Sequence, residues 1–201
     1  MPRITLALAA VLLFMAFTPV SAQDFFKGNT AYDAGDYAKA FAEWKPLAER
    51  GNPWAQYSLG LLYGEGQGVV QDYAEAVRWF KLATVHGVAD AQTALGTMFS
   101  RGYGVPQNDF EAINLFRLAA KQGHALAHWQ LGGAYQLGKG VEEDPFKAHM
   151  WYTIASANGD EMAADNRDQI ANVYVWRPAD ISKAQAMARE CMSSGYEKCG
   201  Y

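Results

Sequence analysis

The stretch "GEGQGVVQDYAEA" occupies residues 64–76, returns as "SRGYGVPQNDFEA" at 100–112, and appears a third time as "LGKGVEEDPFKA" at 137–148. A glycine-rich loop that runs into a helix is how many phosphate-binding sites begin, because free backbone N–H groups at a helix N-terminus attract anions. A phosphate loop, however, follows a strand and ends in Gly-Lys followed by Ser or Thr. Three copies without that ending indicate a structural repeat, and we expect no nucleotide to bind here.

The repeat extends well beyond the loop, with the same spacing of 36 residues. It relates five acidic or Asn positions, five alanines and five glycines: Asp36, Asp72, Asn108, Asp144 and Asp180; Ala40, Ala76, Ala112, Ala148 and Ala184; Gly51, Gly87, Gly123, Gly159 and Gly195. A period of this length is typical of solenoids, in which each unit buries its apolar face against its neighbours.

The second half of each unit has the pattern of an amphipathic helix. An Asp or Asn stands at the N-cap position, and apolar residues follow at i, i+3, i+4 and i+7, as in Ala76, Trp79, Phe80 and Ala83. Glycines such as Gly87 suit a left-handed C-terminal cap after this helix. We expect the tryptophans on this stripe, Trp44, Trp79 and Trp151, to lie in the core.

The first half of each unit is a helix with an unfavourable glycine inside it. These helices read "AQYSLGLLY", "AQTALGTMF" and "AHWQLGGAY", beginning at Ala55, Ala91 and Ala127. The internal glycines are Gly60, Gly96 and Gly132. Glycine in a helix interior costs about 1 kcal/mol relative to alanine. We therefore expect close approach between neighbouring helices to offset that cost.

These patterns predict an all-α fold, an α-solenoid of about five antiparallel helix pairs. A single domain of residues 23–201 is expected, with units at about 24–51, 52–87, 88–123, 124–159 and 160–195 and then a C-terminal tail.

The N-terminus predicts export. Arg3 precedes the apolar run "ITLALAAVLLFMAF", and Val20 and Ala22 fit a cleavage site before Gln23, so residues 1–22 are expected to be a signal peptide. The alternative is an uncleaved membrane anchor, but the run is short for a spanning helix. No later stretch approaches spanning length. We expect a periplasmic or secreted bacterial protein.

Charge and cysteine content agree with an exported protein that does not bind nucleic acid. Removing Arg3 with the signal leaves 16 of the 17 Lys and Arg residues against 21 Asp and Glu, so the mature chain is acidic and lacks a basic footprint for nucleic acid. Cys191 and Cys199 are the only cysteines, and in an oxidising compartment we expect them to form a disulfide.

The combination of A-x-x-x-L-G-x-x-[YF], a G-x-G-V loop, an acidic or Asn cap, A-x-x-W-[FY]-x-x-A and a closing glycine resembles the Sel-one-like repeat (SLR) family, a relative of tetratricopeptide repeats. Three full copies lie at 55–159. The first unit has a shorter turn, and in the last unit Arg167 and Asp168 replace Leu-Gly, which is typical of capping units. The resemblance implies a right-handed superhelix and an interaction scaffold.

The resemblance also leaves an enzyme as the rival hypothesis, because some cysteine-rich secreted SLR proteins have been linked to β-lactam binding or hydrolysis. The sequence contains no G-x-S-x-G, S-x-x-K, C-x-x-C or H-E-x-x-H motif. His124 and His128 are spaced to share a metal, but no third ligand joins them, so we expect a solvated helix start instead. His149 is expected to pack, and His86 to lie at a helix C-terminus. No catalytic residue, metal or cofactor is expected.

The expected binding surface lies on the first helices, on the side opposite the core. In tetratricopeptide-like solenoids these helices line the concave surface, which would hold a protein or peptide partner from the cell envelope. The expected groove residues are Tyr57, Leu61, Thr93, Thr97, Trp129 and Gly133. Tyr57 and Trp129 are also compatible with packing against the next unit, and Trp54 and Trp176, outside the repeat, with either sealing or contact.

Overall fold

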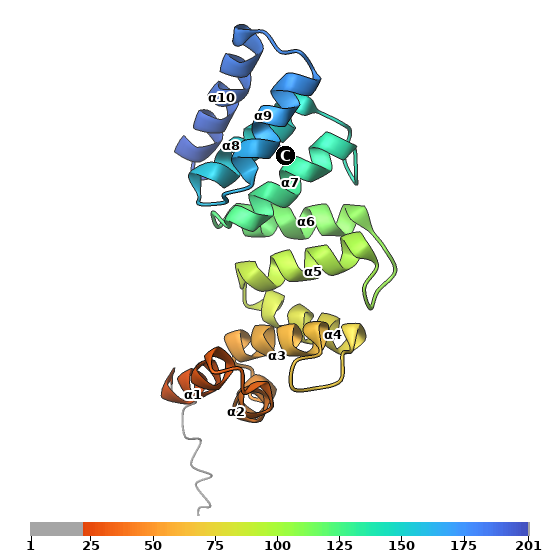
Figure 1. The fold of residues 1–201 in the computed structure, drawn as a ribbon, viewed down its shortest axis with the longest axis vertical. Coiled ribbons are helices and arrows are strands. Elements are labelled where there is room, and N and C mark those ends of the chain that lie inside the picture. The colour runs from red at the N-terminus through yellow and green to blue at the C-terminus, as the bar shows by residue number, and fades with distance from the viewer. Residues whose placement is uncertain (1–21, 201) are drawn as a thin grey trace, which may run out of the picture.

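The computed structural model describes residues 22–200, so the predicted signal peptide lies outside the described residues except for Ala22. The described chain folds into ten helices without a strand, stacked into an elongated array (Figure 1). The helices are α1 (Ala22–Asp33), α2 (Tyr37–Glu49), α3 (Pro53–Glu65), α4 (Tyr73–Val85), α5 (Ala89–Arg101), α6 (Asp109–Ala120), α7 (Ala125–Leu137), α8 (Pro145–Ala157), α9 (Ala163–Val173) and α10 (Pro178–Ser193). The predicted all-α solenoid is confirmed.

Packing follows the chain order over the first four helix pairs. The two helices of each pair contact one another, α1 with α2, α3 with α4, α5 with α6 and α7 with α8. Each second helix then packs on the first helix of the next pair. The predicted core tryptophans, Trp44, Trp79 and Trp151, are all buried.

Helix ends are fixed by the repeated polar and glycine positions. The side chain of Asp72 accepts hydrogen bonds from the backbone N–H groups of Ala74 and Glu75 at 2.9 and 3.0 Å, which satisfies two donors that the helix leaves unpaired. The first helices end in the left-handed conformation at Gly66, Gly102 and Gly138. A side chain with a Cβ atom is strained there, so these glycines stop the helix and begin the loop.

The internal glycines of the first helices lie under aromatic rings of the second helices. A Cβ atom on Gly60 would come within 2.5 Å of the Phe80 ring, and one on Gly132 within 2.6 Å of the Tyr152 ring. A Cβ atom on Gly96 would likewise come within 2.6 Å of the Phe116 ring. The expected close approach is therefore made by a ring, and its contact area offsets the cost of glycine in a helix.

The loop glycines connect one unit to the unit before it. A Cβ atom on Gly104 would lie 2.4 Å from the backbone of Tyr73, and one on Gly140 would lie 2.5 Å from the backbone of Asp109. The loop thus packs directly on the first turn of the preceding second helix. The glycine loop that resembles a phosphate site in sequence is a joint between units.

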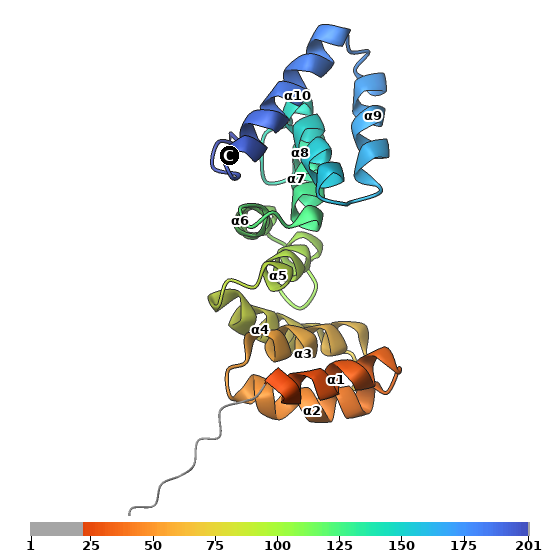
Figure 2. The ribbon, with the colours of Figure 1, turned by 90° about the vertical axis from the view of Figure 1, so that its left-hand side faces the viewer.

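The last two helices depart from the pattern. Helix α10 packs on α8 instead of forming a pair with α9, and Figures 1 and 2 show α9 and α10 splayed apart. Asp168 and Ala188 occupy the positions that correspond to Gly132 and Tyr152. Because both the glycine and the ring are missing, the contact that closes the other pairs cannot form.

Two adjacent glycines in α7 give a matched test of this contact. We expect Gly132→Ala to lower the free energy of unfolding by about 1–3 kcal/mol, since its methyl group would overlap the Tyr152 ring. Gly133→Ala meets only the Tyr152 hydroxyl, at 3.5 Å, and should raise stability by about 0.5–1 kcal/mol through helix propensity. Urea unfolding of both variants measures the difference, and equal stabilities would contradict the ring-on-glycine explanation.

Candidate functional site

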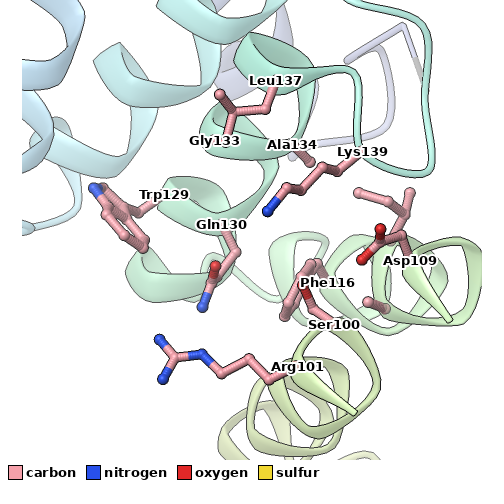
Figure 3. Close-up of a pocket in the computed structure, with 12 residues that line it drawn as sticks. Ser100, Arg101, Asp109, Phe116, Trp129, Gln130, Gly133, Ala134, Leu137 and Lys139 are labelled. Atoms are coloured by element: carbon pink, nitrogen blue, oxygen red, sulfur yellow. The ribbon is translucent and has the colours of Figure 1, made fainter. Parts of the chain in front are cut away.

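The expected groove residues line two hollows along successive first helices. Tyr57, Leu61, Thr93 and Thr97 surround the first hollow, which has a volume of about 480 Å³ and is completed by the start of α7. Trp129 and Gly133 line the second, of about 240 Å³, between α5, α6 and α7 (Figure 3). Helices α5 and α7 therefore contribute to both hollows, while α3 completes the first and α6 the second.

A hydrogen bond between two first helices links the hollows. The side-chain amide of Gln130 on α7 donates to the Thr97 hydroxyl on α5 at 3.3 Å. Thr97 lines the first hollow and Gln130 the second. Neighbouring units thus meet at this surface through polar side chains that also face the hollows.

The two aromatic residues have a packing role in addition to facing the hollows. Tyr57 lies 5.9 Å from Phe80 between ring centres, and burial raises the pKa of its hydroxyl to about 12. Trp129 packs against the core, and its indole N–H is buried without a hydrogen-bond partner among the described residues. Each ring therefore packs against the core and also lines a hollow.

Thr93 contributes far less surface than expected, because it is only 1% exposed. Its hydroxyl lies 2.9 Å from the Ala89 carbonyl of its own helix and 3.0 Å from Nδ1 of His124 in the next unit. A short β-branched side chain bonds back to its own helix, and the imidazole then covers it. Thr93 forms the floor of the first hollow, with little surface for a partner.

Thr93, His124 and Asp90 form a cluster that the sequence analysis did not find. Nε2 of His124 lies 3.3 Å from the Asp90 carboxylate, and this hydrogen bond lowers the pKa of Asp90. A hydroxyl, an imidazole and a carboxylate in series are also the parts of a hydrolase triad. Here the hydroxyl is buried and shared with a helix carbonyl, so it is poorly placed to attack a substrate.

His128 is fully buried, so the expectation of a solvated helix start is wrong for this residue. Its Nε2 donates to the Ala120 carbonyl at 3.0 Å, and its Nδ1 accepts from the Asn158 amide at 3.2 Å. Gln56 makes the corresponding bond to the Ala48 carbonyl at 3.1 Å. Each side chain adds a hydrogen bond to a last-turn carbonyl that also accepts from a backbone N–H, that of Gly51 at Ala48 and that of Gly123 at Ala120.

The remaining candidates are structural or exposed. His149 is buried as expected and lies 5.1 Å from Trp176, which stacks on Phe146 at 4.6 Å. Trp176 therefore packs on two side chains of α8, whereas Trp54 is 49% exposed. Within residues 22–200, no group of three or more His, Cys, Asp or Glu residues is arranged to hold a metal ion.

The C-terminal tail folds back onto the array. The expected disulfide between Cys191 and Cys199 is present. It closes a loop whose Tyr196 ring lies 5.0 Å from His128, and the Asn158 amide donates to the Tyr196 hydroxyl at 3.0 Å. The tail thereby covers the buried histidine where α7 meets α8.

The repeat geometry agrees with the comparisons with known proteins. The sequence profile of the Sel1 repeat matches residues 55–84, 89–124 and 125–160, together just over half of the chain. The chain belongs to the Sel1 repeat family. Sel1 repeats generally form scaffolds for protein–protein interaction. A comparison with curated proteins finds no match.

Two solved structures show the same Sel1 architecture. A Sel1 repeat protein from Oxalobacter formigenes is 27% identical, with a TM-score of 0.66, and the match covers 85% of this chain and 77% of that one. The other is c5321, a protective antigen of uropathogenic Escherichia coli strains with an SLR fold, 29% identical at a TM-score of 0.66. That match covers 88% of this chain but 43% of c5321.

The buried state of His128 makes stability depend on pH. Burial lowers its pKa from 6.5 to about 4, so its contribution is complete above pH 6.5 and is lost as the pH falls toward 4. The corresponding residues of other units are Gln56 and Gln92, so His128→Gln should fold. We expect this variant to lose less stability than the wild type between pH 6.5 and 4.5, by up to about 1.4 kcal/mol per pH unit.

Urea unfolding across that pH range measures the difference. The exposed residue His86 provides the control, since His86→Gln removes an imidazole without removing a buried one. A His128→Gln variant with an unchanged slope would show that the buried imidazole does not cause it.

The disulfide should stabilise the tail mainly by restricting the unfolded chain. Cys191 and Cys199 are 8 residues apart, and closing so small a loop contributes about 2–3 kcal/mol. Reduction should lower the free energy of unfolding by that amount, measured by urea unfolding with and without reductant. A variant with both cysteines replaced by alanine should not respond to reductant. Two free thiols in the unreduced purified protein would contradict the bond.

Proposed function

We propose that this Sel1 repeat protein is a non-enzymatic scaffold of the bacterial envelope, which holds an extended segment of a protein partner along α3, α5 and α7. The observation that carries the proposal is the pair of hollows in series on these helices, linked by Gln130 and Thr97. Their lining combines apolar side chains with a few charged ones, Asp90, Arg101 and Lys139, a mixture typical of binding pockets.

Export is supported by the sequence and by the disulfide. The residues that precede Gln23 have the pattern of a signal peptide, and residues 23–201 would then form one repeat domain. A disulfide persists in oxidising compartments such as the periplasm. Among the described residues, no helix combines the length and apolar character that crossing a membrane requires. Envelope assembly, polysaccharide export and signalling control are the processes that such a scaffold would serve.

The rival function is a periplasmic hydrolase or a β-lactam-binding enzyme. The cluster of Thr93, His124 and Asp90 is the observation that favours it. Thr93 is nearly inaccessible, and its hydroxyl is hydrogen-bonded to the helix backbone, so the scaffold has the stronger support. Turnover of a β-lactam or of peptidoglycan that Thr93→Val abolishes would reverse this preference.

Filling the second hollow tests the scaffold directly. Gly133→Leu adds a side chain there without removing a core contact, whereas Trp129→Ala would also disturb packing. We expect Gly133→Leu to reduce capture of an envelope partner at least tenfold, as loss of a well-packed interface contact does.

The measurement is a quantitative pull-down from the envelope fraction, together with a melting curve for each variant. Ala42→Leu places the same side chain on an exposed face of α2 and serves as the matched control. A partner that binds Gly133→Leu as well as the wild type would show that the groove is not its site.

A further inference from the structure

The second hollow has a counterpart one repeat earlier in the solenoid, lined mostly by residues 36 positions before its own. At the earlier junction, the hollow is lined by Glu65 from α3, Tyr73 from α4 and Tyr103 from the loop between α5 and α6. The two tyrosine rings stack there with 4.8 Å between their centres. An uncharged aromatic pair therefore covers this part of the earlier junction.

At the next junction the same three positions are charged. Arg101, Asp109 and Lys139 stand 36 residues after Glu65, Tyr73 and Tyr103, and all three line the second hollow. Figure 3 shows Lys139 and Asp109 on facing sides of the hollow, with the Arg101 guanidinium near Gln130. The stacked rings are thus replaced by groups that attract polar ligands.

Within residues 22–200, no ion pair neutralises any of these three charges. Arg101 and Lys139 are exposed and make no ion pair or hydrogen bond with the described residues. Oδ1 of Asp109 is buried and has no hydrogen-bond partner among them. The Asp109 side chain as a whole is partly exposed and lines the hollow, so a ligand that supplies an N–H group would complement its carboxylate.

The floor of the hollow is apolar. Ala112, Ile113 and Phe116 of α6 face Ala134 and Leu137 of α7, and Trp129 flanks them. The volume of about 240 Å³ is below the range typical of drug-sized ligands, and suits a single amino-acid residue. Two cations, one carboxylate in need of a donor and an apolar floor are therefore combined in a space of that size.

We propose that the second hollow binds the C-terminal residue of a protein partner. The α-carboxylate lies between Arg101 and Lys139, the backbone N–H of the same residue donates to Asp109, and an apolar side chain contacts the floor. A terminal residue carries the carboxylate and the N–H on one Cα atom, which an internal Asp or Glu does not. The assignment rests on the proposed scaffold function and specifies its ligand chemistry.

Peptides of defined ends test the proposal. The protein without its predicted signal peptide is applied to an array of random decapeptides attached through their N-termini, with free carboxylates at their C-termini. Peptides that bind are then measured in solution by fluorescence anisotropy, as free acids and as C-terminal amides. We expect apolar final residues among the binders and a loss of affinity of about tenfold or more on amidation.

Single substitutions assign the carboxylate contacts. Arg101→Gln and Lys139→Gln should each weaken binding of the free acids by about ten- to a hundredfold, because each removes a charge-assisted hydrogen bond. Arg189→Gln and Lys198→Gln remove the same charges from exposed positions outside the hollow and should leave affinity unchanged. Asp109→Asn should weaken the acids and amides equally, since its contact is to the peptide N–H.

The proposal is overturned if no free-acid peptide binds, or if amidation and both glutamine variants leave affinity within threefold of the wild type. An envelope partner that Gly133→Leu blocks but Arg101→Gln and Lys139→Gln do not affect would overturn the terminal-carboxylate assignment and leave the scaffold standing. If Gly133→Leu leaves capture of the partner unchanged and no peptide binds, both the scaffold groove and its ligand are wrong.

Discussion

The contact between a helix glycine and an aromatic ring controls how this solenoid is built. It occurs in four successive pairs, as Gly28 with Trp44, Gly60 with Phe80, Gly96 with Phe116 and Gly132 with Tyr152. The missing Cβ atom sets how close the two helices come, and the ring fills the space between them. Where the pair of residues is absent, α10 leaves α9 and packs on α8, and a disulfide holds the tail that follows.

The sequence predicted the parts of the structure that depend on position within one unit. The spacing of Asp72, Gly87 and their counterparts indicated the helix caps, and the apolar stripe indicated the buried tryptophans. Residues that meet across units were harder to predict. Thr93 was expected on the surface, but the imidazole of His124 covers it from the next unit. Periodicity identifies which face a side chain occupies and leaves open what the adjacent unit places over it.

The two junction hollows illustrate how a repeat protein acquires specificity. The backbone arrangement is shared, because each loop glycine rests on the preceding helix in the same way. The side chains at corresponding positions differ, from stacked tyrosines at one junction to separated charges at the next. The architecture and the surface chemistry of a junction are therefore carried by different residues, so the chemistry of one junction can change without altering the stack.

The C-terminal tail makes the two ends of the described helix stack differ in how firmly they are held. In a linear stack each unit is supported only by its neighbours, so the end units open first. The C-terminal end is cross-linked and its Tyr196 covers His128, whereas α1 packs mainly on α2 and has no such cross-link among the described residues. Among the described helices, we therefore expect α1 to open before the cross-linked end. The helices nearest the cross-linked tail, α7 and α8, also line or adjoin the charged hollow, so we expect that hollow to lie in the part of the stack that opens last.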